Sequence, residues 1–533
     1  MHSLENRSPL RLNLNATSIS VDAELFQKDS SLARYFWREE HADVVDRIVF
    51  KYPAKRLVLS KSLEIQIMFP VALSVMDIPL AIFTSVIVFQ WLVYFWDTYV
   101  SWRQYVVTKK NTKVPPELIG IVDEETMEKA RAYALDKARY SFWHGLYSQI
   151  EITVILCFDL IPIVWYATNN LFKDLGYENE ILNSMVFLLL SSFYSLVTGF
   201  PWSVYSTFVI EEKHGFNKQT FRFFIWDMIK KFIVLQIIML PLIALLIVII
   251  QKGGDFFFIY AWLFVLVISI AIITIYPPYI APLFDKYVPL PESPLRTSIQ
   301  TLTDSVNFPL SEMFVVEGSK RSAHSNAYFI GLIKKRIVLF DTLLLNFPPT
   351  DEADQSKLIE EVEVKKKKGC SDPEVLAVLG HELGHWKLWH VPKNFVFMQF
   401  NILINFLVFA LLYKNDAIYE AFGFMNSKPT LIGLFIIFQF IFQPYEELLN
   451  CIITYCSRRF ELQADGFVVK LTNEGKLTDG VENLKKALLK LHVDNLSFPY
   501  NDWLYSAIHY SHPPLLDRLR ALEAFDGEKY GQL

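Results

Sequence analysis

The chain has 533 residues, of which 52% are hydrophobic and 15% aromatic, and its mean hydropathy is positive. Soluble enzymes rarely have this composition, which is typical of proteins that cross a membrane several times. The formal net charge of −5 carries no basic surplus, so the balance excludes nucleic acid as an expected partner. The cysteines form no CxxC pair and no spacing suited to zinc or to a disulfide framework; they are Cys157, Cys370, Cys451 and Cys456.

Residues 1–60 are polar and mixed, without a sustained periodicity. The first strong apolar run comes too late in the chain for a secretory signal sequence. We therefore expect residues 1–75 to be an N-terminal extension that is either disordered or lumenal.

Seven apolar runs predict membrane-crossing helices. The run from Ile78 to Trp96 has 19 residues without a charge, which is the length that crosses the hydrocarbon core as a helix. The other runs are 152–167, 185–205, 232–250, 256–276, 395–412 and one that begins at 431. The pattern predicts a mainly α-helical, polytopic membrane protein with helices 1 to 5 in residues 76–276 and helices 6 and 7 in residues 395–456.

Two of the seven runs are interrupted by charge. Asp159 lies inside the second run, and the seventh has twelve residues free of charge before it reaches Gln443, Glu446 and Glu447. Charges at membrane depth are costly and usually face the interior of a helix bundle or a water-filled cavity. The alternative for the seventh run is that its helix ends early, and the sequence leaves both possibilities open.

Basic residues around the first run predict the orientation. The 20 residues before it hold one basic residue, whereas the 20 after it hold four; these five are Lys61 and then Arg103, Lys109, Lys110 and Lys113. Because basic loops stay in the cytosol, the N-terminus is predicted to be lumenal. Seven crossings then place residues 277–394 and the C-terminal tail together in the cytosol.

Residues 277–394 read as a soluble part. The segments "MFVVEG" (313–318) and "RIVLFD" (336–341) are rich in β-branched and aromatic residues and predict strands. The charged segment 360–374 predicts a solvated linker. Its four lysines are also compatible with a nuclear-import signal, which is a weak interpretation in a polytopic chain.

Two histidines four residues apart predict a zinc site in the segment 374–390. This segment has no proline, consists of good helix formers and follows Asp372-Pro373, a suitable helix start. On a helix His381 and His385 lie one turn apart on the same face, so both can bind one ion. Glu382 beside them can hold a metal-bound water and remove its proton, which assembles the hydrolysis of an amide. The alternative is two surface histidines on a helix, because a chance HExxH is expected in roughly one chain in a hundred.

A catalytic zinc needs a third protein ligand and an open position. In "RRFELQADGF", Glu461 can be that ligand while Asp465, one turn later, orients a ligand histidine from outside the coordination sphere. The alternative is that this segment is an ordinary amphipathic helix that carries two acidic residues. Two predicted spans separate His381 from Glu461, however, so both emerge on the same side of the membrane and can meet.

Two further motifs offer groups that can hold a substrate. In "HYSHPPLLDRL", His512 lies in a stiff stretch before two prolines and Arg518 follows on a new helix. Either can donate a hydrogen bond to a tetrahedral oxyanion, or both can serve as structural caps. In "SAHSNAYFIG", a strand with Asn326 at a sheet edge can pair with an extended peptide, with the side-chain amide adding register.

Together these segments resemble a known family, the integral-membrane CAAX prenyl proteases. The resemblance runs from about residue 78 to about residue 522 and is carried by "VLGHELGHW", "SRRFELQAD", "GSKRSAHSNAYF", "RIVLFDTLL", "VIEEKHGFNKQT", "APLFDKYVPLP" and "HYSHPPLL". It implies seven helices around a large water-filled chamber, closed at the cytosolic end by a zincin-like zinc protease site. The implied activity is removal of the last three residues of a C-a-a-X sequence after prenylation of its cysteine. The substrates implied are farnesylated or geranylgeranylated proteins, including those of the prelamin A type, in the endoplasmic reticulum and inner nuclear membranes.

The same resemblance implies a role for each candidate residue. One zinc ion per chain would be held by His381, His385 and Glu461, the last of these in a C-terminal catalytic part, residues 457–533. Glu382 would be the base, and Asp465 and Arg518 would orient the ligands. Asn326 would bind substrate and His512 would lie near the oxyanion. The family pattern does not require the first 75 residues, so they are expected to be a lineage-specific extension or to precede a true start at Met76.

Two other functions fit parts of the sequence. A broad membrane quality-control protease would also carry HExxH, but the resemblance extends far outside that motif. A membrane scaffold without catalysis would be expected to lose Glu382, His385 or Glu461, and all three are present.

Overall fold

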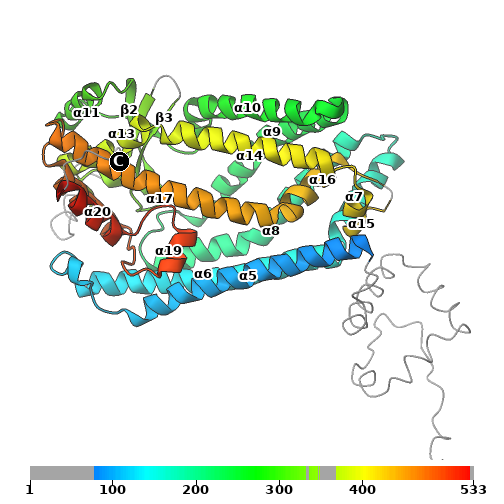
Figure 1. Ribbon diagram of the computed structural model, residues 1–533, viewed down its shortest axis with the longest axis horizontal. Coiled ribbons are helices and arrows are strands. Elements are labelled where there is room, and N and C mark those ends of the chain that lie inside the picture. Colours follow the sequence, from blue (N-terminus) through cyan, green and yellow to red (C-terminus); the bar gives the residue numbers. More distant parts are fainter. Residues whose placement is uncertain (1–76, 332–334, 346, 348–367, 426, 528–533) are drawn as a thin grey trace, which may run out of the picture. The chain divides into compact units, whose positions relative to one another are not determined.

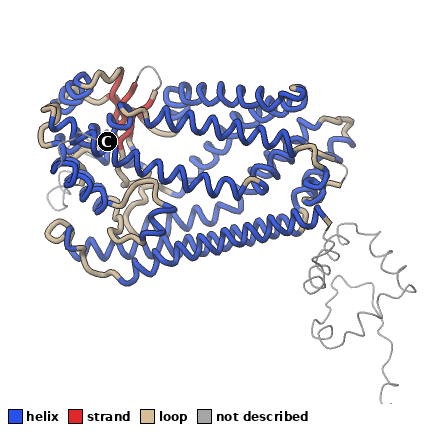
Figure 2. The backbone as a smooth tube through the Cα atoms, in the orientation of Figure 1, coloured by secondary structure: helices blue, strands red, loops and turns tan. Residues whose placement is uncertain are grey.

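The computed structural model of the protein describes residues 77–331, 335–345, 347, 368–425 and 427–527, which belong to one unit. The predicted extension, residues 1–75, and residues 360–367 of the predicted linker lie outside them. The described chain is mainly α-helical. Its strands gather at one end of the long helices, beside the C-terminal helices (Figure 1 and Figure 2).

Five described helices are long and apolar enough to cross a membrane. They are α5 (Ile78–Lys110), α8 (Glu180–Tyr205) with a π-helical continuation (Ser206–Glu211), α9 (Phe221–Lys252), α10 (Phe257–Ile275) and α14 (His390–Leu412). Two further candidates are bent pairs: α6 (Glu124–Cys157) with α7 (Leu160–Asp174), and α16 (Thr430–Ile436), continued by a π-helix (Ile437–Ile441), with α17 (Gln443–Asn473). The described part of the chain thus has five candidate spans by length and composition, or up to the seven that the sequence predicts if each bent pair is one span.

The bend between α6 and α7 lies at the charged residue of the second predicted run. Asp159 adopts a left-handed backbone conformation, with φ of 51°, and the two helices differ in direction by 56°. Aspartate tolerates this conformation better than most residues because its short polar side chain bonds locally. The loop at Gly423 packs against the bend, where an added Cβ would lie 3.0 Å from Asp159 Oδ1. The charge therefore marks a break in the span, not a position inside a continuous helix.

The seventh predicted run also bends, by 60°, and then continues. Pro444 stands in the first turn of α17, where a proline fits the new helix but cannot continue the preceding one. The straight helix thus ends at the break, and the chain continues as a second helix in a new direction, so the structure combines the two possibilities that the sequence left open. Glu446, just after the bend, accepts a hydrogen bond from Asn405 Nδ2 of α14 at 3.3 Å, so its carboxylate faces a neighbouring helix.

A four-stranded sheet forms beside the helices, in the order β1-β2-β4-β3. β2 (Leu310–Val316) and β4 (Lys335–Phe340) are parallel neighbours and confirm the two strands predicted from their β-branched and aromatic residues. β1 (Tyr287–Pro289) and β3 (Ala327–Ile330) pair with them antiparallel at the two edges. The predicted edge strand thus exists as β3.

The helix that carries the HExxH motif is α13 (Asp372–Lys387). Its N-terminus is stabilised by a capping box, in which the Glu374 carboxylate accepts a hydrogen bond from the backbone of Ser371 at 2.7 Å. Glu374 also pairs with Lys490 of α18 (Gly480–Asp494) at 2.6 Å. α13 packs against α17 and α18, with the sheet and α11 (Pro294–Ser305) close by. Three short helices complete the described fold: α15 (Asp416–Ala421), α19 (Trp503–His509) and α20 (Leu515–Gly527).

The packing of α13 on α17 depends on a glycine inside the HExxH motif. A Cβ at Gly384 would lie 3.0 Å from Ala464 Cα and 3.0 Å from Phe467 Cβ, closer than side chains normally approach. The missing side chain therefore lets the two helix backbones come together. This contact brings the histidines of α13 opposite the acids of α17.

Two large clusters of buried apolar side chains form most of the described interior, beside a small third one at Tyr133, Ile210 and Phe216. One lies between the sheet, α11, α13, α18, α20 and the C-terminal half of α17. The other lies among the membrane-crossing helices and α15, and it includes Phe442 at the start of α17. α17 therefore runs from the cluster among the membrane-crossing helices to the cluster beside the sheet (Figure 1).

Candidate metal centre

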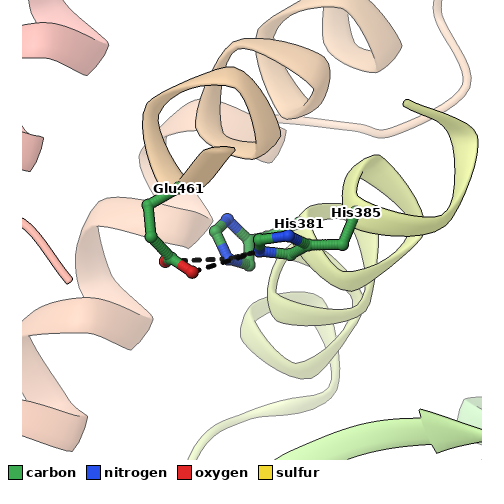
Figure 3. A group of neighbouring side chains, drawn as sticks. All are labelled: His381, His385 and Glu461. Carbon is green, nitrogen blue, oxygen red and sulfur yellow. Dashed lines mark hydrogen bonds and ion pairs between the residues drawn. The ribbon is translucent and has the colours of Figure 1, made fainter. Parts of the chain in front are cut away.

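The side chains of His381, His385 and Glu461 converge between α13 and α17 (Figure 3). The two Nε2 atoms lie 3.1 Å apart, and the carboxylate oxygens of Glu461 lie 3.4 Å from His381 Nε2 and 3.3 Å from His385 Nε2. Ligands about 2.05 Å from a tetrahedral zinc are about 3.3 Å apart. The three side chains thus have the mutual spacing of three zinc ligands.

The chemistry of this ligand set also fits a metal. His381 and Glu461 are buried, with 7% and 6% of their surfaces exposed. Glu461 Oε2 makes no hydrogen bond of good geometry, although His512 Nδ1 lies 2.9 Å from it. A buried carboxylate oxygen without a well-aligned donor is costly. A divalent cation bound by all three side chains would satisfy it.

Asp465 and Arg518 hold His381 from behind. His381 Nδ1 lies 2.9 Å from Asp465 Oδ1, which leaves the Nε2 lone pair to face the centre. Arg518 donates to both oxygens of Asp465, from Nε at 2.9 Å and from Nη2 at 2.6 Å. Arg518 is buried on α20. The Arg518 guanidinium thus holds the Asp465 carboxylate in the position where it contacts His381, a candidate ligand.

The protein surroundings also set the protonation of His381. Burial opposes a charge on this imidazole, but hydrogen bonds to Asp465 and Glu461 outweigh it and raise its pKa to about 9. A metal that binds here must therefore displace a proton, so binding weakens as the pH falls below this pKa.

Glu382 lies next to His381 on α13 and is half-buried. Burial raises the pKa of its carboxyl above the ordinary value, while the nearby His381 and His385 oppose this rise. A raised pKa suits a carboxylate that must take up a proton during a reaction near neutral pH.

His512 reaches the same centre from the stretch between α19 and α20. Its Nδ1 is 2.9 Å from Glu461 Oε2, and 66% of its side chain is exposed. It thus combines contact with a candidate ligand and access from solvent. This geometry places His512 beside the candidate centre, and its predicted role near an oxyanion stays a prediction.

Asn326 lies immediately before β3, not within it as the sequence suggested. Its backbone oxygen accepts a hydrogen bond from Phe340 of β4 at 3.0 Å, so it continues the ladder by one residue. Its side chain is exposed, and its Oδ1 accepts from the following backbone N–H at 2.8 Å. β3 contacts α13, so the free edge of the sheet lies beside the HExxH helix.

Sequence reasoning missed one residue pair at the centre. His390, at the start of α14, lies with its Nδ1 3.0 Å from His385 Nδ1, and Gln463 of α17 contacts its other nitrogen. The only sequence signal was a third histidine five residues after the second, on the far side of an unpredicted helix break.

The chain matches two family patterns that adjoin each other. Residues 104–286 match the family described as CAAX prenyl protease N-terminal, five membrane helices, and residues 289–526 match peptidase family M48. The chain is 54% identical over 459 residues to the CAAX prenyl protease 1 homolog of Mus musculus, which covers 83% of this chain and 95% of the relative. It is 36% identical over 454 residues to CAAX prenyl protease 1 of Saccharomyces cerevisiae, covering 81% and 93%. This chain belongs to the CAAX prenyl protease 1 family of M48 peptidases.

A solved structure agrees with the membership. The crystal structure of S. mikatae Ste24p superposes with a TM-score of 0.72 at 36% identity, covering 84% of this chain and 99% of that one. The M48 family consists of metallopeptidases, which generally use zinc, and its N-terminal pattern is that of a multi-pass membrane protein. The predicted family is therefore confirmed, as is the class of enzyme, a membrane metalloendopeptidase.

Comparing a Glu461 variant with an Asp465 variant distinguishes a metal ligand from a residue that orients a ligand. We expect Glu461→Ala to lose zinc and activity together, because it removes one of three ligands. Asp465→Asn keeps the ligands and should weaken zinc binding or activity by about 10–100-fold. Zinc content and affinity, measured by chelator competition on purified protein, decide between them. Glu482→Ala, an exposed acid on α18, serves as the control. Wild-type zinc affinity in Glu461→Ala would mean that another residue is the third ligand.

Proposed function

We propose that this protein is a zinc endopeptidase that removes the last three residues from prenylated CAAX proteins. The observation that carries the proposal is the convergence of His381, His385 and Glu461 at the spacing of a tetrahedral metal site, with Glu382 beside them. The curated relatives named CAAX prenyl protease 1 support the choice of substrate, because the chain spans 95% of the mouse relative.

The proposed mechanism assigns one task to each residue around one zinc per chain. When bound, zinc lowers the pKa of a water and polarises the scissile carbonyl. Glu382 removes the proton of the water through its carboxylate and delivers it to the leaving amine. His512 donates a hydrogen bond to the oxygen on which charge develops. Asp465 and Arg518 keep the His381 ring in the orientation that ligation needs.

The edge of the sheet would hold the substrate. β3 has one neighbour, β4, so its other edge has backbone groups available for an extended peptide. Pairing through the backbone tolerates different side chains, which suits the variable aliphatic positions of a CAAX sequence. The exposed Asn326 amide would hold the peptide near the scissile bond.

A water-filled chamber among the helices would admit the lipid-modified tail. One support is that only between 11% and 17% of the most apolar stretch in each single-helix span is buried, so these helices leave surface that faces lipid and the space between them. Glu151 of α6 is the second support, since it accepts hydrogen bonds from Tyr147 at 3.2 Å and Tyr194 of α8 at 2.9 Å. A carboxylate at the edge of a membrane span usually faces water. The substrates would be farnesylated or geranylgeranylated proteins, including the prelamin A type, and membrane lipids would surround the helices.

The orientation follows from four basic residues, of which Arg103, Lys109 and Lys110 lie in the C-terminal part of α5 and Lys113 lies in the loop after it. Glu117 in this loop pairs with Arg520 of α20 at 2.7 Å, so the loop and the C-terminal catalytic part lie at the same end of the helices. Because basic loops stay in the cytosol, we place the catalytic parts there and the N-terminus in the lumen. The membranes would be those of the endoplasmic reticulum and the inner nuclear envelope.

The chain would divide into alternating membrane and catalytic parts. Residues 76–276 and 395–456 would be the membrane parts, and residues 277–394 and 457–533 the catalytic parts. The two large apolar clusters, one beside the sheet and one among the membrane-crossing helices, support this division. A general quality-control protease and a scaffold are not favoured, since the relatives are named for CAAX processing and the ligand set and Glu382 are intact.

Glu382→Gln tests the proposed chemistry. The amide cannot take a proton, so the variant should bind zinc and fold normally yet hydrolyse almost no farnesylated CAAX peptide. Zinc analysis and single-turnover assays on the same membranes check this, and Glu482→Gln should behave as the parent chain. Full activity in Glu382→Gln would rule out the assigned base.

Asn326→Ala tests the proposed substrate strand. A positioning role predicts normal zinc and fold with turnover lower by roughly tenfold or more. A role as a strand cap predicts a lower melting temperature and normal turnover per folded molecule. Ser311→Ala is the matched control, because Ser311 also bonds backbone at a strand end, to Lys335 O at 2.9 Å. If Asn326→Ala behaves like this control, the amide is structural.

Glycosylation tests the orientation. Asn6 in "NRS" and Asn15 in "NAT" should be modified because they would be lumenal, while Asn495 in "NLS" should stay bare. Glycosidase treatment should shift the parent chain but not the Asn6→Gln/Asn15→Gln double variant. Modification at Asn495 would invert the proposed topology.

A further inference from the structure

The break between α13 and α14 turns a third histidine back toward the metal centre. α13 ends at Lys387, and Trp389 adopts a left-handed conformation with φ of 61°. α14, a membrane-crossing helix, starts at the next residue, His390. A bulky residue in this conformation is strained, so the surrounding structure must hold it there.

His390 is enclosed by the centre that it faces. Only 1% of its surface is exposed, and its ring stacks on Phe460 of α17 with centroids 4.3 Å apart and an interplanar angle of 11°. Its Nδ1 lies 3.0 Å from His385 Nδ1, and its Nε2 lies 3.0 Å from Gln463 Oε1. Both ring nitrogens of this buried side chain therefore have a partner.

If His385 binds the metal, only one arrangement of protons fits the series of hydrogen bonds from His385 through His390 to Gln463. His385 Nε2 faces His381 and Glu461, so it must carry the lone pair that binds a metal, and its proton must lie on Nδ1. His390 Nδ1 then accepts that proton's hydrogen bond, and His390 Nε2–H donates to the Gln463 carbonyl oxygen. The reverse arrangement would put a proton on His385 Nε2 and block the site.

We propose that His390 and Gln463 are positioning residues that fix the tautomer and ring orientation of His385 for metal binding. The inference rests on the proposed zinc site and adds to it. His381 is oriented through Asp465 and Arg518, which carry charge, whereas His385 would be oriented through a neutral histidine and an amide. The hydrogen bonds through His390 and Gln463 also connect His385 to the first residue of a membrane-crossing helix.

Replacement of His390 tests the proposal through zinc affinity. His390→Phe keeps an aromatic ring against Phe460 but cannot accept a hydrogen bond, so zinc should bind about 10–100-fold more weakly. His390→Asn places an amide oxygen where Nδ1 stood and should restore most of the affinity. Gln463→Leu should give a smaller loss in the same direction. His492→Phe, a change of a half-buried histidine on α18, is the matched control and should leave the affinity unchanged.

The measurements are zinc dissociation constants by chelator competition and the absorption spectrum of the Co²⁺-substituted full-length protein in detergent. A changed ligand orientation should alter the Co²⁺ bands in His390→Phe but not in His390→Asn. Equal zinc affinity in His390→Phe and the parent chain would overturn the inference. If His390→Phe does not fold, parent-like affinity in Gln463→Leu would overturn it. Hydrolysis of a farnesylated peptide by the parent chain is scored separately, so the proposed substrate can fail while the inference stands.

Discussion

The metal centre depends on the close approach of α13 and α17. The two histidines lie on one of these helices and the glutamate on the other, so the distance between the helices determines whether three ligands can share one ion. Gly384 permits the approach because a side chain there would meet Ala464 and Phe467. The same residue stands between the two histidines of the motif, so the packing contact and the ligands are only a turn apart.

Because the candidate metal centre is buried, each charged side chain in it needs a partner. In an apolar surrounding, a carboxylate or imidazolium is costly unless a partner of opposite charge or a hydrogen bond compensates it. Asp465 is fully buried and is compensated by two bonds from Arg518 and by His381. Glu461 lacks a comparable donor on one oxygen, although it lies in the same place. The difference distinguishes a carboxylate with a finished structural role from one that is arranged for a metal.

The sequence predicted those parts of the site that follow from local spacing and from counting spans. His381 and His385 follow from helical periodicity, and Glu461 follows from parity, because two spans return the chain to the same side. It did not predict the breaks. Asp159 and Trp389 adopt left-handed conformations that the residue types at those positions do not demand. His390 was missed for this reason. If α13 continued without the break, His390 would lie on an extension of that helix.

α17 is one continuous helix that leads from the bend among the membrane-crossing helices to Glu461 at the candidate metal centre. From its first residue at the bend to Glu461 there are 18 residues, or roughly 27 Å of helix at 1.5 Å per residue. A rigid rod of this length moves its far end by about 1 Å for every 2° of tilt at the near end. An error of about an ångström is already enough to spoil a catalytic arrangement. A tilt of α17 at the bend would therefore be carried to Glu461, so the packing that fixes the bend also fixes one side of the candidate metal centre.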